Sequence, residues 1–349
     1  MKIAIITDQH FGARKNSKLF HDYFLKFYND IFFPTLEKKG ITTVIDMGDT
    51  FDNRTGVNFG ALSWAKSNYY DRLQQMGVKV HTIVGNHTAF YKNTNSINAV
   101  DLLLREYTNV TVYSEPEEVL LDNLKVLFIP WINEENEKKT FKLIESTDCK
   151  VSMGHLELRG FAANKQCIME HGHDRKLFKK FIQVFSGHYH TRSSSDQISY
   201  LGNPYEIYWN DVNDPRGFHI YDTETLELEP IDNPYKMFNI MYYDDDSASL
   251  LDARPYENKI VKIIVRNKPR VKEFEKVIDK LYSAGVAELK IIENYNFSGW
   301  YDDKENLEFE SEDTLSILNR YIEEAETTLN KSTLSMFMKE TYQEACEMV

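Results

Sequence analysis

Five short motifs between residues 8 and 190 carry side chains that commonly bind metal ions. They are Asp8-Gln9-His10, Gly48-Asp49-Thr50-Phe51-Asp52, Gly85-Asn86-His87, Gly154-His155 and Gly187-His188-Tyr189-His190. Their oxygen and imidazole donors, without a thiolate, favour Mn²⁺, with Mg²⁺, Fe²⁺ and Zn²⁺ as alternatives. Seven candidate ligands are too many for one tetrahedral ion, so we expect two ions that share a bridging carboxylate, for which Asp49 is the natural candidate. Two ions about 3.5–4 Å apart favour in-line displacement at phosphorus, so the motifs indicate a two-metal phosphoesterase.

Each motif follows a short apolar run that is typical of a buried strand. The runs are Ile3–Ile6, Thr43–Met47, Val80–Val84, Val151–Met153 and Val184–Ser186. In open α/β sheets, ligands bind beyond the carboxyl ends of the strands, so five strand-end loops are expected to converge on one site. The glycines of the motifs fit sharp turns or a close backbone approach at these ends.

The motifs, in this order, resemble those of the calcineurin-like metallophosphoesterases. Gly187-His188-Tyr189-His190 and the later Asp214-Pro215-Arg216-Gly217-Phe218 resemble the SbcD-type nuclease branch, and within it the small subunits of T-even-type phage recombination endonucleases. The resemblance runs through most of the chain. It implies a calcineurin-like two-sheet α/β sandwich, a small α/β capping domain and a C-terminal helical hairpin.

The resemblance also implies roles for individual residues. Two ligand groups would share Asp49: Asp8, His10 and His190 for one ion, and Asn86, His155 and His188 for the other. His87 would be the catalytic residue that approaches the scissile phosphate and assists the leaving oxygen. Family members often carry Asp after Asn-His, where this chain has Thr88, and such an Asp can orient the histidine. Asp52 is a second position that varies within the branch.

The length of 349 residues exceeds that of a typical single domain. We expect a metallophosphoesterase domain at 1–230, a capping domain at 231–298, an acidic linker at 299–312 and a helical tail at 313–349. Apolar spacing predicts helices at Lys18–Lys39, Phe59–Met76 and Ser96–Tyr107. Such nucleases usually dimerise through helices of the phosphoesterase domain, and Phe59–Met76 is our candidate for that face.

The net charge of −13 counts against a simple basic DNA-binding protein. Cations near the motifs and in the capping domain are candidate phosphate contacts: Arg14, Lys15, Arg54, Lys92, Arg159, Arg192, Lys268 and Arg270. Ordinary solvated loop charge explains any single one of them about as well. The acidic total also suggests that a partner supplies much of the grip on DNA.

The C-terminal tail reads as two short amphipathic helices that bury little by themselves. The resemblance implies that they dock on the coiled coil of an SbcC-type ATPase, through Leu315, Leu318, Ile322, Leu334, Phe337 and Thr341. A helical hairpin packed on its own chain is the alternative. The partner would use the ATP, because this chain has no Gly-x-x-x-x-Gly-Lys-Ser/Thr loop.

Three scattered cysteines fit a reducing compartment, and no apolar stretch approaches the roughly 18–20 residues that span a bilayer. The N-terminus enters a strand at once, so we expect no signal peptide and a cytoplasmic protein, in the host cytoplasm if a phage encodes it. The sequence thus predicts a Mn²⁺-dependent DNA nuclease subunit of an SbcCD-type recombination and repair complex. It would be a double-strand exonuclease and single-strand endonuclease. A phosphatase for nucleotides or phosphoproteins, or an inactive DNA-tethering subunit, remains the alternative.

Overall fold

The computed structural model describes residues 1–164, 167–244, 251–268, 270–293, 321–323, 327 and 329–348. The chain divides into two compact units, Met1–Asn294 and Tyr295–Val349. In the first unit, two six-stranded sheets carry the five motifs.

The first sheet has the N-terminal strand near its middle. Its order is β16 (Leu228–Asp232), β15 (Gly217–Asp222), β1 (Lys2–Ile6), β2 (Thr43–Asp46), β3 (Lys79–Ile83) and β6 (Val110–Tyr113). The last four of these strands are parallel, and β15 runs antiparallel to both β1 and β16. The carboxyl ends of β1, β2 and β3 therefore lie at one edge.

The second sheet supplies the other two motif strands. Its order is β13 (Ser193–Ser195), β14 (Ile198–Tyr200), β12 (Gln183–Gly187), β9 (Val151–His155), β8 (Leu124–Ile129) and β7 (Glu117–Leu121). The four central strands are parallel, and β13 and β7 pair antiparallel at the two edges. β9 ends at His155 and β12 ends at Gly187, so both place a motif at the carboxyl edge.

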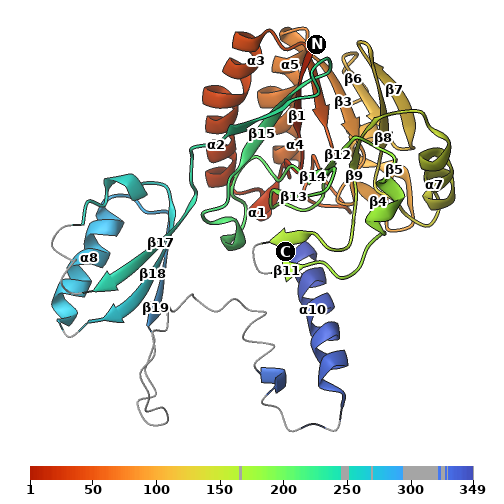
Figure 1. The fold of residues 1–349 in the computed structure, drawn as a ribbon. Coiled ribbons are helices and arrows are strands. Elements are labelled where there is room, and N and C mark those ends of the chain that lie inside the picture. The colour runs from red at the N-terminus through yellow and green to blue at the C-terminus, as the bar shows by residue number, and fades with distance from the viewer. Residues whose placement is uncertain are drawn as a thin grey trace. The chain divides into compact units, whose positions relative to one another are not determined.

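Alternation along the strands builds two apolar layers. Ile3 and Ile5 of β1 point into a core shared by the two sheets, where they meet side chains such as Phe128 and Met153. Ala4 and Ile6 point the other way, into an aromatic-rich core against the helices. Those helical segments are α1 (Ala13–Asn16), α2 (Lys18–Phe27), η1 (Tyr28–Phe32), α3 (Phe33–Lys39), α4 (Phe59–Ala65), η2 (Lys66–Tyr70) and α5 (Asp71–Gln75). In Figure 1 the helices and the second sheet lie on opposite sides of the first sheet.

Shorter elements complete the sandwich. They are β4 (Ala89–Tyr91), β5 (Thr94–Asn98), α6 (Ala99–Leu103), α7 (Glu137–Ser146), β10 (Ala162–Asn164), β11 (Cys167–Ile168), η3 (Arg175–Phe178) and η4 (Trp209–Asp211). The helix predicted at Ser96–Tyr107 is wrong at its start, because β4 and β5 form a hairpin and the helix begins only at Ala99. The Asn98 side chain accepts a hydrogen bond from the Asp101 amide at 2.8 Å, which caps that helix.

The end of the first unit has a small sheet with its own core. Three parallel strands, β17 (Phe238–Asp244), β18 (Ile260–Asn267) and β19 (Glu288–Glu293), pack against α8 (Val271–Ser283), and η6 spans Arg254–Tyr256. Val261, Ile263 and Val265 of β18 meet Phe274, Val277 and Leu281 of α8. Glu206 fixes the entry to this sheet, since its buried carboxylate accepts hydrogen bonds from the amides of Met237 and Phe238 at 2.7 and 2.9 Å.

The second unit is described mainly as α10 (Lys331–Met348). The Asn330 side chain accepts from the amides of Ser332 and Thr333, at 2.9 and 3.2 Å, and so caps the helix. Leu315, Leu318 and the linker at 299–312 lie outside the described residues, and of the expected first helix only residues 321–323, which are helical, are described. Within the described parts of the chain, no helix is both long and apolar enough to cross a membrane.

Candidate metal centre

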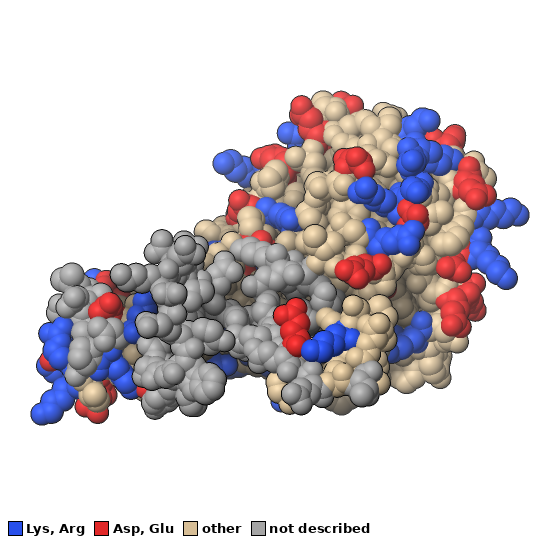
Figure 2. Space-filling model, turned by 60° about the horizontal axis from the view of Figure 1, so that its bottom comes forward, with Lys and Arg blue, Asp and Glu red and all other residues tan. Residues whose placement is uncertain are grey.

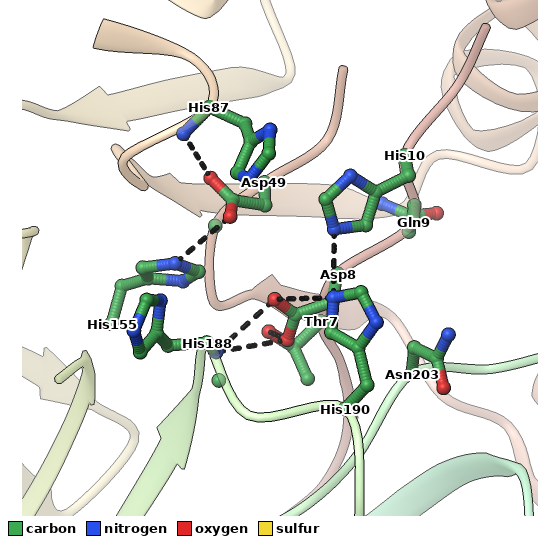
Figure 3. A network of polar contacts seen from close by, with 12 residues as sticks. Thr7, Asp8, Gln9, His10, Asp49, His87, His155, His188, His190 and Asn203 are labelled. Carbon is green, nitrogen blue, oxygen red and sulfur yellow. Dashed lines mark hydrogen bonds and ion pairs between the residues drawn. The ribbon is translucent and has the colours of Figure 1, made fainter. Parts of the chain in front are cut away.

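The loops that follow β1 and β2 are held together by main-chain hydrogen bonds. The amide of Asp8 donates to Gly48 and the amide of His10 donates to Asp49, both at 2.9 Å. The loop after β12 joins them, because the amide of His188 donates to both carboxylate oxygens of Asp8 at 3.1 Å. Motifs separated by up to 180 residues thus meet at one place (Figure 3).

The first ligand group consists of Asp8, His10 and His190. Their ligand atoms lie within 4.8 Å of one another. The Nε2 atoms of His10 and His190 face each other at 3.0 Å. Two imidazole nitrogens aimed at the same point, next to a carboxylate, are a suitable set for a divalent cation.

The second ligand group consists of Asp49, His155 and His188, whose ligand atoms also lie within 4.8 Å of one another. His155 Nε2 lies 3.1 Å from Asp49 Oδ2. The side-chain oxygen of Asn86 lies 2.9 Å from His155 Nε2 and 3.0 Å from His188 Nδ1. The structure therefore brings all seven predicted ligand side chains to the same edge of the two sheets.

Three motif glycines are needed because the ligands crowd the backbone. A Cβ atom on Gly85 would overlap the Asp49 carboxylate, and one on Gly48 would overlap the His155 ring. A Cβ atom on Gly187 would overlap Thr7 and Asp8. Glycine at these three positions therefore leaves the space that the ligand side chains occupy.

Four ligand residues occupy the left-handed backbone region, which non-glycine residues seldom adopt. Their φ angles are 51° for Asp8, 46° for His10, 50° for Asp49 and 86° for His188. Each such residue costs on the order of 1–3 kcal/mol, and strain of this kind clusters at functional sites. The hydrogen bonds between the loops hold these conformations in place.

The pKa values of the ligands shift in both directions. Burial opposes protonation of His155 and His10, but nearby carboxylates outweigh it and raise the pKa of His155 to about 9 and that of His10 above its usual range, while burial raises the pKa of Asp8. Burial, with a further contribution from His155, lowers the pKa of His188 to about 3. Burial and then His10 lower the pKa of His190 well below its usual range. Burial opposes ionisation of Asp49, but His155 and His87 outweigh it and hold the Asp49 pKa well below its usual range. Neutral imidazoles and carboxylates both offer lone pairs to a metal ion.

His87 lies beside the ligands but is not in either group. Its amide donates to Asp49 Oδ1 at 2.8 Å, and its ring centroid is 4.9 Å from that of His10. Its Nδ1 lies 2.7 Å from the carbonyl oxygen of Asp52, so that nitrogen carries the proton and donates it. Thr88 does not orient His87, because its hydroxyl accepts a hydrogen bond from the Gly85 amide and donates to the Gly85 carbonyl, both at 3.1 Å. The carbonyl of Asp52 therefore orients His87.

Asp52 also supports the first ligand group, a role that the sequence did not show. Its carboxylate lies 3.1 Å from Nδ1 of His10, the ring nitrogen opposite the one that faces His190. Metal-binding histidines usually have their second ring nitrogen held in this way. The spacing Gly48-Asp49-x-x-Asp52 was the available signal.

The predicted DNA-contacting cations are placed in different ways. Arg159, Arg192 and Lys268 form ion pairs with Asp174, Asp232 and Glu293. Other cations stack on aromatic rings: Arg14 on Phe20 at 5.6 Å and Arg54 on Trp131 at 5.1 Å. Lys15, Lys92 and Arg270 are exposed.

Comparison with known proteins gives the family. The model for calcineurin-like phosphoesterases matches residues 1–192. Exonuclease subunit 1 of Enterobacteria phage T4 is 31% identical over 350 residues, which cover 99% of this chain and 100% of that protein. Two solved structures are each 15% identical to this chain. The match to an archaeal phosphodiesterase covers 67% of this chain and 100% of that one, with a TM-score of 0.35. The match to nuclease MPE of Pseudomonas putida covers 65% of this chain and 86% of that one, with a TM-score of 0.31. The family match and the full-length likeness show that this chain belongs to the calcineurin-like phosphoesterases, which are metal-dependent enzymes.

Proposed function

We propose that this chain is the nuclease subunit of a DNA recombination and repair complex. It would act with Mn²⁺ as a double-strand exonuclease and a single-strand endonuclease. The observation that carries the proposal is the likeness to a phage exonuclease subunit over 99% of the chain, which includes the regions after the phosphoesterase match. A compact phosphatase needs neither the small β17–β19 unit nor the C-terminal helix.

The two ligand groups would hold two divalent ions, Asp8, His10 and His190 one and Asn86, His155 and His188 the other, with Asp49 shared. When bound, such ions supply an activated water and stabilise charge on the phosphate. The chain itself supplies His87. With Nδ1 donating to the Asp52 carbonyl, Nε2 is the nitrogen left for the substrate, and in the doubly protonated ring it would give its proton to the leaving sugar oxygen and leave a neutral imidazole.

The small sheet offers a basic face for DNA. On the side of β18 away from α8, Lys262 lies directly across from Lys290 of β19. Like charges in that position are destabilising in an isolated sheet, and a phosphate backbone relieves them. Lys262 also stacks on Trp209 at 4.1 Å, and Arg266 stacks on Tyr242 at 4.2 Å. We therefore propose residues 231–298 as the capping, DNA-contacting domain, with Lys268 and Arg270 at its edge.

On the face of the molecule seen in Figure 2, Lys and Arg side chains are interspersed with Asp and Glu side chains. No single-sign patch dominates the part of that face drawn in colour. This mixture, in a chain of net charge −13, supports a DNA grip that depends on a partner subunit.

The partner we propose is an SbcC-type coiled-coil ATPase bound by the tail at 313–349, beyond the linker at 299–312. Leu334, Phe337 and Thr341 of α10 follow helical spacing, and Phe337 is 61% exposed. Ile322 is buried. The proposed dimer face needs a correction, since Ala65, Tyr69, Tyr70 and Leu73 are fully buried in the helix-side core. The exposed start of α4, with Phe59 at 88%, is the part of Phe59–Met76 that remains for a homodimer contact.

The test is degradation of end-labelled duplex DNA with Mn²⁺, without and with the ATPase partner. We expect cleavage by the wild type and at least a 100-fold loss in His87→Gln and in Asp49→Asn. Cleavage that survives both substitutions contradicts the assigned site. Hydrolysis of p-nitrophenyl phosphate without any cleavage of DNA favours a phosphatase instead.

A further inference from the structure

The motif Asp214-Pro215-Arg216-Gly217-Phe218 places one arginine inside the protein. Arg216 is only 1% exposed. A buried guanidinium is stable only if its charge is paired and its donors meet acceptors. Its Nη2 donates to Asp211 Oδ1 at 3.0 Å and to Asp214 Oδ2 at 2.9 Å, so two carboxylates pair with the charge, while Nε has no hydrogen-bond partner among the described residues.

The other terminal nitrogen of Arg216 is directed to the metal centre. Nη1 donates to the backbone carbonyl of His190 and to the side-chain oxygen of Asn203. The amide of Asn203 also donates to the His190 carbonyl, at 3.2 Å. Figure 3 shows Asn203 next to His190. Two donors from one cluster therefore hold the backbone of one metal ligand.

His190 differs from two other histidine ligands in how its ring is supported. His155 has its Nδ1 bonded to the Met47 carbonyl at 2.9 Å, and His10 has its Nδ1 bonded to Asp52 at 3.1 Å. Among the described residues, Nδ1 of His190 has no hydrogen-bond partner, and its Nε2 faces His10. The direction of its ring therefore depends on how its backbone is held.

The cluster around Arg216 is itself anchored on several segments. The second carboxylate oxygen of Asp211 accepts from the amides of Ile207 and Tyr208 at 2.6 and 2.8 Å. The carbonyl of Arg216 accepts from the Asn233 amide at 2.7 Å, and the Asn233 side chain donates to the Pro204 carbonyl at 3.0 Å. These hydrogen bonds therefore hold the Arg216 guanidinium in one position.

We propose that Arg216 is a positioning residue of the metal centre. Its fork fixes the backbone of His190, and thereby the imidazole that completes the ligand group of Asp8 and His10. The inference rests on the metal centre of the proposed function and does not depend on DNA as the substrate. It assigns a role to the one branch-specific motif that the reaction leaves unused.

The test is Mn²⁺ binding to the purified full chain, followed by electron paramagnetic resonance. We expect two ions per chain in the wild type and a signal of a spin-coupled pair. In Arg216→Met, we expect one ion to bind about 10–100-fold more weakly while the other is unchanged, as in His190→Ala. Arg216→Lys restores part of the affinity, because an ammonium reaches one acceptor but lacks the fork.

Glu206→Gln is the matched control. Glu206 is equally buried and holds two backbone amides, but it does not contact His190. This variant should lower the melting temperature without changing either Mn²⁺ affinity. If Arg216→Met folds and binds both ions as the wild type does, the proposal is overturned.

Equal weakening of both ions in Arg216→Met and Arg216→Lys also overturns the proposal, since a general structural role predicts that result. If Arg216→Met does not fold, the decision passes to Arg216→Lys, for which unchanged binding of both ions is the contrary result. A wild type that binds two ions but cleaves no DNA contradicts the proposed function and leaves this inference standing. A wild type that binds fewer than two ions contradicts both.

Discussion

At the scale of single residues, the metal centre depends on backbone conformations that are unfavourable by themselves. Asp8, Asp49 and His188 all have positive φ angles, and the loops around them are locked by hydrogen bonds between motifs. The same crowding excludes side chains at Gly48, Gly85 and Gly187. The hydrogen bonds between the loops therefore hold the ligand side chains in fixed positions, which is the preorganisation that catalysis by fixed charges needs.

This crowding gives a sharp prediction for Gly85→Ala. The added methyl group would overlap the carboxylate of Asp49, so we expect that ligand to be displaced. A displacement of about 1 Å can lower a rate about 100-fold, and we expect a loss of that order in Mn²⁺-dependent hydrolysis of bis-p-nitrophenyl phosphate. Gly56→Ala is the control, because a Cβ atom there meets nothing within 4 Å. Full activity in Gly85→Ala would show that Asp49 is not an essential ligand.

The ligand side chains were predictable from sequence because each stands directly after an apolar strand with a glycine nearby. The residues that orient them were less so. The carboxylate of Asp52 contacts His10, and its backbone carbonyl accepts a hydrogen bond from His87. Every residue has a backbone carbonyl, so the second role cannot be predicted from the residue type. Arg216 was visible in a motif, but only the fold shows that it reaches His190 across 26 residues.

At the scale of elements, the strands were predicted well because alternating burial leaves a clear pattern. The hairpin of β4 and β5 was missed for a physical reason. Ile97, Val100 and Leu104 have helical spacing, yet Asn95 holds the hairpin by donating to the carbonyls of Ser114 and Trp131 at 3.2 and 2.9 Å. Those bonds join segments that are distant in the sequence, and helical spacing alone does not include them. The calcineurin-like two-sheet sandwich itself is confirmed by the family match.

Strand β15, between β16 and β1 in the first sheet, holds a histidine that should make stability depend on pH. His219 of β15 is 5% exposed, and burial, with Arg192 nearby, lowers its pKa to about 3. The unfolded chain, with a histidine pKa near 6.5, then binds more protons than the folded chain between about pH 6.5 and 3. This contribution to stability is complete above about pH 6.5 and is lost as the pH falls, by about 2 kcal/mol at pH 5.

Urea unfolding at pH 7.5 and pH 5.0 measures this effect against His219→Gln. Carboxylates and other histidines contribute equally to both proteins, so the difference between their pH slopes isolates His219. We expect the wild type to lose about 2 kcal/mol more than the variant between the two pH values. Parallel losses would mean that His219 can take up a proton in the folded protein.

At the scale of the whole molecule, one chain combines a metal-dependent hydrolase with parts that a simple hydrolase lacks. The β17–β19 sheet has its own core and joins the sandwich through Glu206. The helix α10 belongs to a separate compact unit. The sequence showed these parts as changes in composition and spacing, but it showed neither Glu206 nor the cap by Asn330, because both roles are hydrogen bonds to backbone amides.

The exposed side of α10 gives the last prediction, which concerns the proposed ATPase partner. Phe337 is 61% exposed, so Phe337→Glu should change the free energy of unfolding by no more than about 0.5 kcal/mol. The same change places a charge in an apolar contact if α10 docks on a coiled coil. We expect at least a 100-fold weaker complex, measured by titration of the purified ATPase subunit. Ser332→Glu is the control, since Ser332 is exposed on the same helix but lies on the face opposite the stripe of Leu334, Phe337 and Thr341. If Phe337→Glu binds the ATPase as tightly as the control does, that stripe is not the docking surface. If hydrolysis of a small phosphodiester stays normal while the complex is lost, catalysis and assembly are separate properties of the two units.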